Sequence, residues 1–246
     1  MHDVYGARSS CSSSVGRINV SNTQHQSITA ILGGTFNPPH QGHINAALSA
    51  ADTLGINSVQ LMPSKLPPHK QVDVSEVHRV NMIELSCKGN ERLSPQLIEL
   101  SLPSPSYTVK TLRALKQASS DTICFFIGAD SLYNLDQWYE WEALLSYCHL
   151  IVMRRDSETF SPGPAITRWL GKNAITNKDE LYTKPNGCVL LVDTPLFNVS
   201  STALREMLCK RSNIDKNGDE SSADILDQWL PSGVIEYIEA NQLYKS

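Results

Sequence analysis

The feature that most constrains the fold is an alternation of short apolar runs with helical patterns along most of the 246 residues. Six runs have the length and composition of buried strands: Ile28–Leu32, Ser58–Met62, Gln96–Leu100, Thr122–Ile127, His149–Met153 and Cys188–Val192. Helical patterns are expected at Ile44–Leu54, Ser75–Cys87, Tyr107–Gln117, Trp138–Leu145, Ser200–Lys210 and Val234–Asn241. This alternation predicts an α/β fold, a doubly wound parallel sheet with helices on both faces.

A single domain is expected to hold this whole pattern. A chain of 246 residues that is 41% hydrophobic can bury a sizeable core. Residues 1–27 are rich in Ser, Asn and Gln and lack apolar periodicity, so they are predicted to form a disordered N-terminal extension to a domain at 28–246. Within that domain, Arg155–Lys184 is interpreted as an insertion and Arg211–Ser222 as a polar loop.

Composition argues against several classes of protein. The net charge of −4 and the lack of a basic tract argue against binding of nucleic acid. No apolar run approaches the roughly 20 residues that a membrane-spanning helix needs. The six cysteines include no C-x-x-C pair, so free thiols and a cytoplasmic location are expected in place of disulfides or a zinc site. Composition leaves open whether the chain is a monomer or a homo-oligomer.

The first chemically informative segment follows the first predicted strand. Gly33 to His43 reads G-G-T-F-N-P-P-H-Q-G-H and leads into a helical pattern. A strand, a glycine-rich turn and a helix in that order bring backbone N–H groups and a positive helix end to one point, which suits a phosphate. His40 and His43 would face such a phosphate. An ordinary surface turn is the alternative, whereas metal ligation lacks further ligands at a usual spacing.

A second segment of this kind is Val199–Glu206, which reads V-S-S-T-A-L-R-E. Its hydroxyl cluster precedes a helical run, and a simple helix N-cap would explain it. Exposed N–H groups, hydroxyls and Arg205 one turn inside would also form a second anion site. Two anion sites beyond the first and sixth strands suit a ligand with several phosphates. No Walker, G-x-S-x-G or G-x-G-x-x-G pattern accompanies them.

Together the two segments resemble the H-x-G-H and S-S-T-x-x-R motifs of the nucleotidylyltransferase superfamily. More narrowly, the chain resembles bacterial nicotinate-nucleotide adenylyltransferases over residues 28–245. The narrower resemblance rests on six further motifs, in order along the chain: Pro67–Lys70, Pro105–Thr108, Ile127–Leu132, Trp138–Glu140, His149–Arg155 and Thr194–Ser200. Asn37 departs from the family pattern, because many relatives carry Asp there, but Asn keeps a hydrogen-bonding side chain.

The resemblance implies a Rossmann-like nucleotidylyltransferase fold and an enzyme that transfers AMP from ATP to nicotinate mononucleotide. The products are deamido-NAD, for NAD biosynthesis, and pyrophosphate, and Mg²⁺ is expected to bridge the ATP phosphates. His40 and His43 are the expected catalytic residues, as donors to α- and β-phosphate oxygens. The expected ATP site comprises these histidines with Gly33, Gly34, Thr35, Phe36, Lys70, Gly128, Asp130, Ser200, Ser201, Thr202 and Arg205.

The resemblance also implies a site for nicotinate mononucleotide. Its expected residues are Asn37, Thr108, Trp138, Tyr139 and Arg154. Trp138 would stack on the pyridine ring, while Thr108 and the backbone at Tyr139 would meet its carboxylate. Without the resemblance, a Trp-Tyr pair at a helix start more often packs in a core.

Alternatives remain open for individual residues and for the function. Asp130 suits ribose hydroxyls but also a helix N-cap, and Lys70 suits a triphosphate but also a solvated surface. Arg155 is an equal candidate to Arg154 for contact with a phosphate. Rival functions are an adenylyltransferase acting on nicotinamide mononucleotide or another phosphate acceptor, and a non-catalytic nucleotide sensor. The Trp138-Tyr139 pair argues against an acceptor such as phosphopantetheine, and the intact pair of transfer motifs argues against a sensor. The sequence leaves the preference between nicotinate and nicotinamide mononucleotide open.

Overall fold

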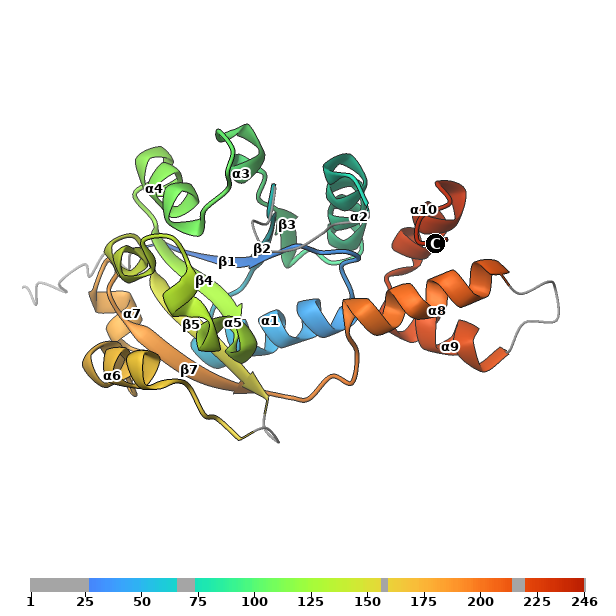
Figure 1. Ribbon diagram of the computed structural model, residues 1–246. Coiled ribbons are helices and arrows are strands. Elements are labelled where there is room, and N and C mark those ends of the chain that lie inside the picture. The colour runs from blue at the N-terminus through green and yellow to red at the C-terminus, as the bar shows by residue number, and fades with distance from the viewer. Residues whose placement is uncertain (1–26, 66–73, 156–158, 214–219, 246) are drawn as a thin grey trace, which may run out of the picture.

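The computed structural model describes residues 27–65, 74–155, 159–213 and 220–245. Within these residues one all-parallel sheet runs in the order β3-β2-β1-β4-β5-β7-β6 (Figure 1). The strands are β1 (Ile28–Gly34), β2 (Val59–Pro63), β3 (Leu93–Pro95), β4 (Thr122–Gly128), β5 (His149–Arg155), β6 (Ala174–Ile175) and β7 (Val189–Thr194). The predicted fold class, a doubly wound parallel sheet, is therefore confirmed.

The strand order reverses beside β1. The chain first moves outward from β1 to β2 and β3, and then returns to place β4, β5, β7 and β6 on the other side. Ligands of open α/β sheets bind beyond the carboxyl ends of the strands at such a reversal. The carboxyl ends of β1 and β4 are Gly34 and Gly128, so the topology directs attention to the segments that follow these two glycines.

Both faces of the sheet are apolar, as buried parallel strands require. In β4, for example, Phe125 and Phe126 belong to two different core clusters, one on each face. One face is covered by α1 (Gln41–Leu54), α2 (Glu76–Lys88) and α7 (Glu180–Thr183). The other is covered by α4 (Thr108–Ala118), α5 (Ala129–Tyr133), α6 (Pro164–Asn173) and the 3₁₀ segments η1 (Leu135–Gln137) and η2 (Trp141–Ser146).

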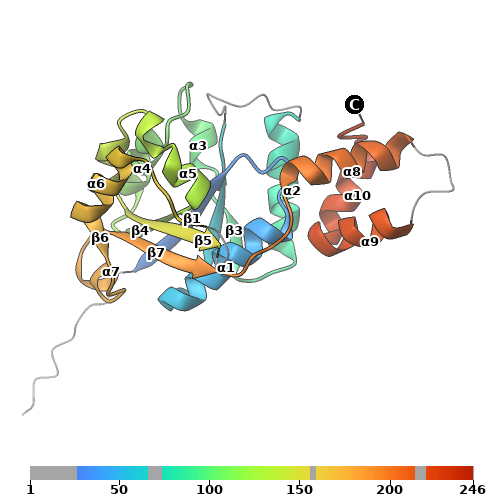
Figure 2. The same ribbon diagram turned by 60° about the horizontal axis from the view of Figure 1, so that its bottom comes forward.

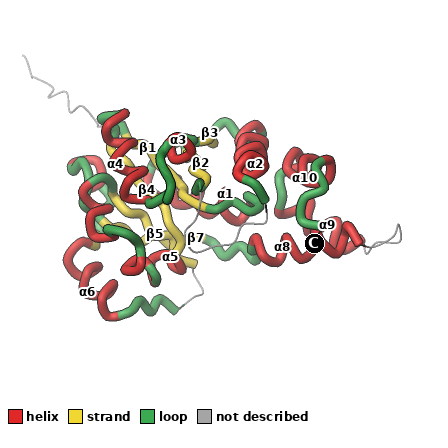
Figure 3. The backbone as a smooth tube through the Cα atoms, turned by 45° about the horizontal axis from the view of Figure 1, so that its top comes forward, coloured by secondary structure: helices red, strands yellow, loops and turns green. Residues whose placement is uncertain are grey.

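Three C-terminal helices form a third apolar cluster beside the sheet. They are α8 (Ser201–Asn213), α9 (Glu220–Trp229) and α10 (Ser232–Ala240), and they gather at one end of the molecule next to α2 (Figure 2). Met82 of α2 packs in the same cluster as Leu204 of α8 and Val234 of α10. These helices therefore extend the domain sideways, and Figure 3 shows them outside the layer of strands.

Three sequence-based boundaries were wrong. The segment Gln96–Leu100, predicted as a strand, contains no strand residue, because β3 ends just before it at Pro95 and most of the segment belongs to α3 (Ile98–Ser101). The Gln96 side chain accepts a hydrogen bond from Ile98 N at 3.1 Å at the start of this helix. The helix predicted at Trp138–Leu145 is broken, because Glu140 adopts a left-handed φ of 49° between η1 and η2. The polar loop predicted at Arg211–Ser222 is too long, since α8 and α9 occupy both of its ends.

The segment Arg155–Lys184 was interpreted from sequence as an insertion on the same domain. It supplies α6, α7 and the edge strand β6, which pairs with β7 and was not predicted. A strand of two residues is too short to show a periodic pattern in sequence. The predicted extension at 1–27 lies almost wholly outside the described residues.

The cysteines of the described residues are free, as predicted. Cys87, Cys124, Cys148 and Cys188 are buried, and Cys209 is partly exposed. Burial raises the pKa of the Cys124 thiol to about 12 and that of Cys87 to about 11, so both stay protonated and inert. Among the described residues, no helix is long and apolar enough to cross a membrane.

Candidate active site

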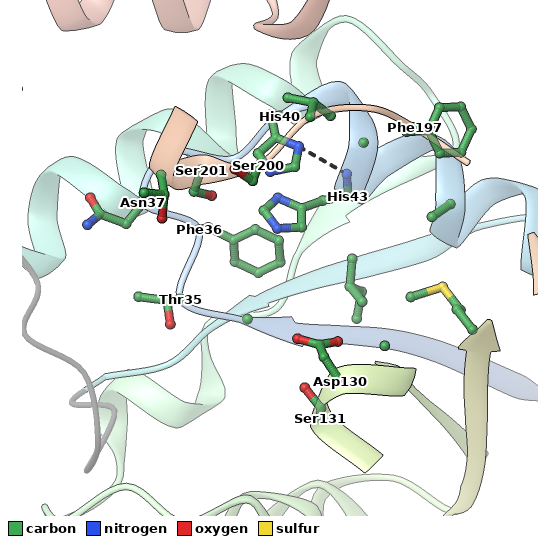
Figure 4. Close-up of a pocket in the computed structure, with 18 of the residues that line it drawn as sticks. Thr35, Phe36, Asn37, His40, His43, Asp130, Ser131, Phe197, Ser200 and Ser201 are labelled. Carbon is green, nitrogen blue, oxygen red and sulfur yellow. Dashed lines mark hydrogen bonds between the residues drawn. The ribbon is translucent and has the colours of Figure 1, made fainter. Parts of the chain in front are cut away.

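A cavity of about 610 Å³ opens at the reversal of the strand order. It lies beyond the carboxyl ends of β1, β4, β5 and β7, and its floor and walls come from both sequence segments singled out above (Figure 4). The predicted residues that line it are Gly33, Gly34, Thr35, Phe36, Asn37, His40, His43, Gly128, Asp130, Ser200, Ser201, Thr202 and Arg205. The fold therefore brings together both predicted anion sites, far apart in sequence, in one cavity.

The turn from β1 into α1 is tightly built. Phe36 adopts a left-handed φ of 50° and is buried, a strained conformation for a residue with a side chain. Its ring meets the His43 ring edge-on, with centroids 5.4 Å apart. Gly33 has to be glycine, because a Cβ there would lie 2.6 Å from Cζ of Phe125. Packing on both sides thus fixes the path of the turn.

The two histidines form a stacked pair at the start of α1. His40 is the N-cap residue of α1, and its Nδ1 accepts a hydrogen bond from the backbone N–H of His43 at 3.3 Å. The two rings lie nearly parallel, with centroids 3.6 Å apart. His43 was expected in the turn itself but lies in the first turn of the helix, three positions after the cap. Both rings face the cavity in Figure 4.

His40 is neutral at physiological pH. The side chain is 4% exposed, and this burial lowers its pKa to about 4. Because Nδ1 accepts the His43 N–H, the single ring proton has to sit on Nε2. His40 therefore presents an N–H donor, without a positive charge, for an acceptor such as a phosphate oxygen.

The start of α8 meets this turn directly. Ser200 caps the helix, since its Oγ accepts from Ala203 N at 3.2 Å, and Ser201 Oγ donates to Pro38 O at 3.2 Å. Arg205 donates from Nη1 to Asn37 O at 2.9 Å and from Nη2 to Thr202 Oγ1 at 3.2 Å. The N-cap interpretation is confirmed, and the same residues hold a guanidinium at the cavity wall.

Three helices begin at the cavity, and the two long ones carry no acidic residue in their first turn. These are α1 and α8, whose N-termini would otherwise be partly neutralised by a carboxylate. The third, α5, begins after Gly128, and its second residue, Asp130, lines the cavity opposite Thr35 and Phe36 (Figure 4). The N-cap of α5 is Gly128, so the N-cap interpretation of Asp130 was wrong.

The residues predicted to hold a nicotinate ring lie outside this cavity but partly together. Thr108 is the first residue of α4, and its neighbour Tyr107 stacks on Tyr139 with ring centroids 4.5 Å apart. Trp138 packs against the core cluster on the α4 face, while Tyr139 is 47% exposed. The start of α4 and the Trp138–Tyr139 pair therefore form one neighbourhood.

Two of the predicted basic residues are not seen at the cavity. Arg154 forms an ion pair with Asp193 at 2.6 Å and lies over the Phe160 ring, with its guanidinium carbon 5.4 Å from the centroid. It therefore faces the β7 side, and its contact with a phosphate stays a prediction. Lys70 lies outside the described residues, and so does the side chain of Arg155.

Sequence reasoning missed one buried cation next to the site. Arg79 of α2 is 2% exposed, and its guanidinium donates to the backbone carbonyls of Thr35, Ser64 and Lys65 at 2.7–3.1 Å. Burial lowers its pKa from the usual value for arginine. Arg79 thereby ties the turn after β1 to the loop after β2. An arginine within a helical pattern gave no signal of this role, because charged helix residues are usually solvated.

A second missed residue, Glu99, links the same loop to α4. Its buried carboxylate accepts from Lys65 N and from Thr111 Oγ1, each at 3.0 Å, and from the Ser106 hydroxyl. Ser106 and Thr111 flank the start of α4. The turn after β1 and the start of α4 are therefore joined through Arg79, Lys65 and Glu99.

Fold and site together define a nucleotidyltransferase. A family model described as cytidylyltransferase-like matches residues 31–207. A curated relative from Yersinia pestis (strain Pestoides F), named "probable nicotinate-nucleotide adenylyltransferase", is 35% identical over 223 residues, 89% of this chain and 96% of the relative. A relative of the same name from Shigella boydii serotype 18 (strain CDC 3083-94 / BS512) is 35% identical over 224 residues, 89% of this chain and 100% of the relative. The chain belongs to the nicotinate-nucleotide adenylyltransferase family.

Solved structures share the fold. The Plasmodium falciparum nicotinic acid mononucleotide adenylyltransferase complexed with NaAD has a TM-score of 0.63 at 18% identity, covering 89% of this chain and 98% of that one. The same enzyme complexed with APC has a TM-score of 0.60 at 20% identity over the same shares. The Rossmann-like architecture expected from the sequence is confirmed.

Proposed function

We propose that this protein transfers the adenylyl group of ATP to nicotinate mononucleotide, forming deamido-NAD and pyrophosphate for NAD biosynthesis. The observation that carries the proposal is the single cavity in which two imidazoles, two helix N-termini and Arg205 converge. Such a set of donors suits a triphosphate. The names of the relatives in the same family agree with this activity.

The protein's part in the reaction is to position the reactants and to stabilise charge. The phosphate of the mononucleotide attacks the α-phosphate of ATP, the bond to the β-phosphate breaks, and pyrophosphate leaves. Negative charge builds on the α-phosphate oxygens and the leaving group. The Nε2–H of the neutral His40 ring can donate a hydrogen bond to these oxygens, and the stacked His43 ring lies beside it. The start of α8 and Arg205 suit the outer phosphates.

Mg²⁺ fits this cavity as a metal that arrives with ATP. The described residues contain no group of three or more His, Cys, Asp or Glu side chains that could hold a metal, and Asp130 is the carboxylate of the cavity lining. Mg²⁺ commonly keeps several waters and binds substrate phosphates with one or two carboxylates. Phosphate oxygens and Asp130 would hold it, and it would neutralise charge on the triphosphate.

The neighbourhood of α4 suits the nicotinate group. Backbone N–H groups at the start of α4 and near Tyr139 only donate, so a carboxylate, which only accepts, matches them. A carboxamide would turn its NH₂ toward at least one donor and leave that donor unpaired, at about 1–3 kcal/mol for each buried group. Two such mismatches correspond to a preference of about 10²-fold or more for nicotinate mononucleotide.

The test is a pyrophosphate-release assay with ATP, Mg²⁺ and a panel of acceptors. The panel contains nicotinate mononucleotide, nicotinamide mononucleotide and phosphopantetheine, each measured as kcat/KM under the same conditions. A clear preference for nicotinate mononucleotide supports the proposal. Equal values for the two mononucleotides would refute the carboxylate pocket but not adenylyl transfer, and no release with any acceptor would refute the enzyme.

A further inference from the structure

The last described residues of the chain reach the turn that carries the histidines. The hydroxyl of Tyr244 donates to Oδ1 of Asn37 at 2.7 Å, although the two residues are 207 positions apart. Both residues are buried. In Figure 4 the Asn37 side chain points away from His40 and His43. Contact of Asn37 with the mononucleotide stays a prediction, and in this structure its side chain oxygen anchors the Tyr244 hydroxyl.

The segment around Tyr244 is shaped to make this contact. Gln242 and Tyr244 adopt left-handed φ values of 56° and 60°, which non-glycine residues keep only where the surroundings enforce them. Tyr244 belongs to the same apolar cluster as Leu204 and Leu208 of α8. The chain after α10 therefore bends back and places one hydroxyl against the turn.

The same turn receives two further hydrogen bonds from the C-terminal part of the chain. Arg205 donates to Asn37 O and Ser201 donates to Pro38 O, two residues before His40. Ser201 and Arg205 also line the cavity, so they are expected to meet phosphates themselves. Tyr244 does not line it. Its hydroxyl meets the turn directly at Asn37, and it also interacts electrostatically with Arg79, which holds the same turn at Thr35 O.

We propose that Tyr244 is a positioning residue for adenylyl transfer: through Asn37 it fixes the turn that presents His40 and His43 to the reacting phosphates. This inference rests on the proposed function. Without the hydroxyl, the Asn37 side chain loses a buried partner, and the turn is held less firmly by its remaining contacts. Small displacements of donors reduce stabilisation of the transition state more than they reduce binding of the substrates.

The variant that isolates this contact is Tyr244→Phe, which removes the hydroxyl and keeps the ring in its apolar cluster. We expect kcat to fall about tenfold while the KM values for ATP and nicotinate mononucleotide change less than about twofold. The matched control is Tyr237→Phe. The Tyr237 hydroxyl lies 2.8 Å from His78 Nδ1 and accepts from Asn81 Nδ2 at 2.7 Å, so it joins α10 to α2 away from the cavity. This control should lower the Tm and leave kcat unchanged.

A double-mutant cycle tests the route through Asn37. If Tyr244 acts through Asn37, Tyr244→Phe should lower kcat in the wild-type background but have no further effect in an Asn37→Ala background. Additive effects, an unchanged kcat in Tyr244→Phe, or equal loss of kcat in both tyrosine variants would overturn the inference. A wild-type protein that releases no pyrophosphate with any acceptor would refute the proposed function and this inference with it.

Discussion

Gly42→Ala is expected to damage the site, although alanine suits a helix better than glycine. Gly42 lies in the first turn of α1 between the two histidines. A Cβ built there would overlap Cγ1 of Val199 and lie 3.0 Å from Nδ1 of His40. Val199 directly precedes Ser200, the cap of α8. The added methyl group therefore pushes apart the two segments that form the cavity.

The magnitude follows from two opposed effects. Gly→Ala in a helix gains about 1 kcal/mol in propensity, whereas overpacking a close contact costs about 1–3 kcal/mol. The net loss is about 1 kcal/mol, which corresponds to a Tm about 2–4 °C lower for a chain of this size. Because the overlap displaces the His40 ring, kcat should fall about tenfold, more than the small loss of stability would suggest.

The assay combines thermal unfolding with pyrophosphate release, and Gly171→Ala is its control. Gly171 lies in α6, and a Cβ there meets no heavy atom within 4 Å. The Gly171→Ala variant should therefore gain only the helix propensity of alanine, with a Tm about 2–4 °C higher and an unchanged kcat. If Gly42→Ala raised the Tm like Gly171→Ala and kept full turnover, the reasoning about close approach of α1 and α8 would be refuted.

Two further predictions concern the histidines. His43→Ala should lower kcat about 10²-fold with the Tm nearly unchanged, and near-normal turnover would return the pair to the surface-turn interpretation. Burial lowers the pKa of His40 to about 4 from 6.5, so between these values the unfolded chain binds a proton that the folded chain does not. The free energy of unfolding should therefore fall by about 3 kcal/mol on this account as the pH drops from 6.5 to 4. His40→Asn keeps a capping side chain and should remove this part of the pH dependence of stability. The part due to the buried His149, whose pKa is also lowered, should remain. Denaturant unfolding at pH 7 and 4.5 measures the free energy of unfolding of the wild type and the variant, and an equal pH dependence in the two would contradict the assignment.

The central strands and the cavity could be predicted from sequence because their signals are local, whereas the short edge strands β3 and β6 could not. β4 and β5 are apolar on both faces, and such runs are recognisable without their neighbours. The two segments predicted to bind anions each combine a helix start with hydroxyls, imidazoles or glycine, and the parallel topology then brings their ends to one edge of the sheet. Local pattern and global fold agree at these positions.

The contacts around the cavity that could not be predicted join residues that are remote in sequence. Nothing beside Arg79 in the sequence indicates that three backbone carbonyls surround its guanidinium, and nothing near Glu99 indicates that it accepts from the Lys65 amide. The bond between Tyr244 and Asn37 is of the same kind. Such contacts are decided by how loops meet after the sheet has formed, so a single sequence carries no period or motif for them.

Both edges of the sheet are nearly closed to other chains. An edge strand offers unpaired N–H and C=O groups on which a strand of another molecule can add. Here one edge is β3, three residues long and ending at Pro95, which has no N–H, and the other is β6, two residues long. A strand of a neighbouring molecule would therefore find almost no unpaired backbone N–H and C=O groups on either edge strand of the described sheet. Copies of this chain that associate are therefore expected to meet through helices and loops. In concentrated protein, aggregation in which one molecule adds a strand to the sheet of another is expected to be suppressed.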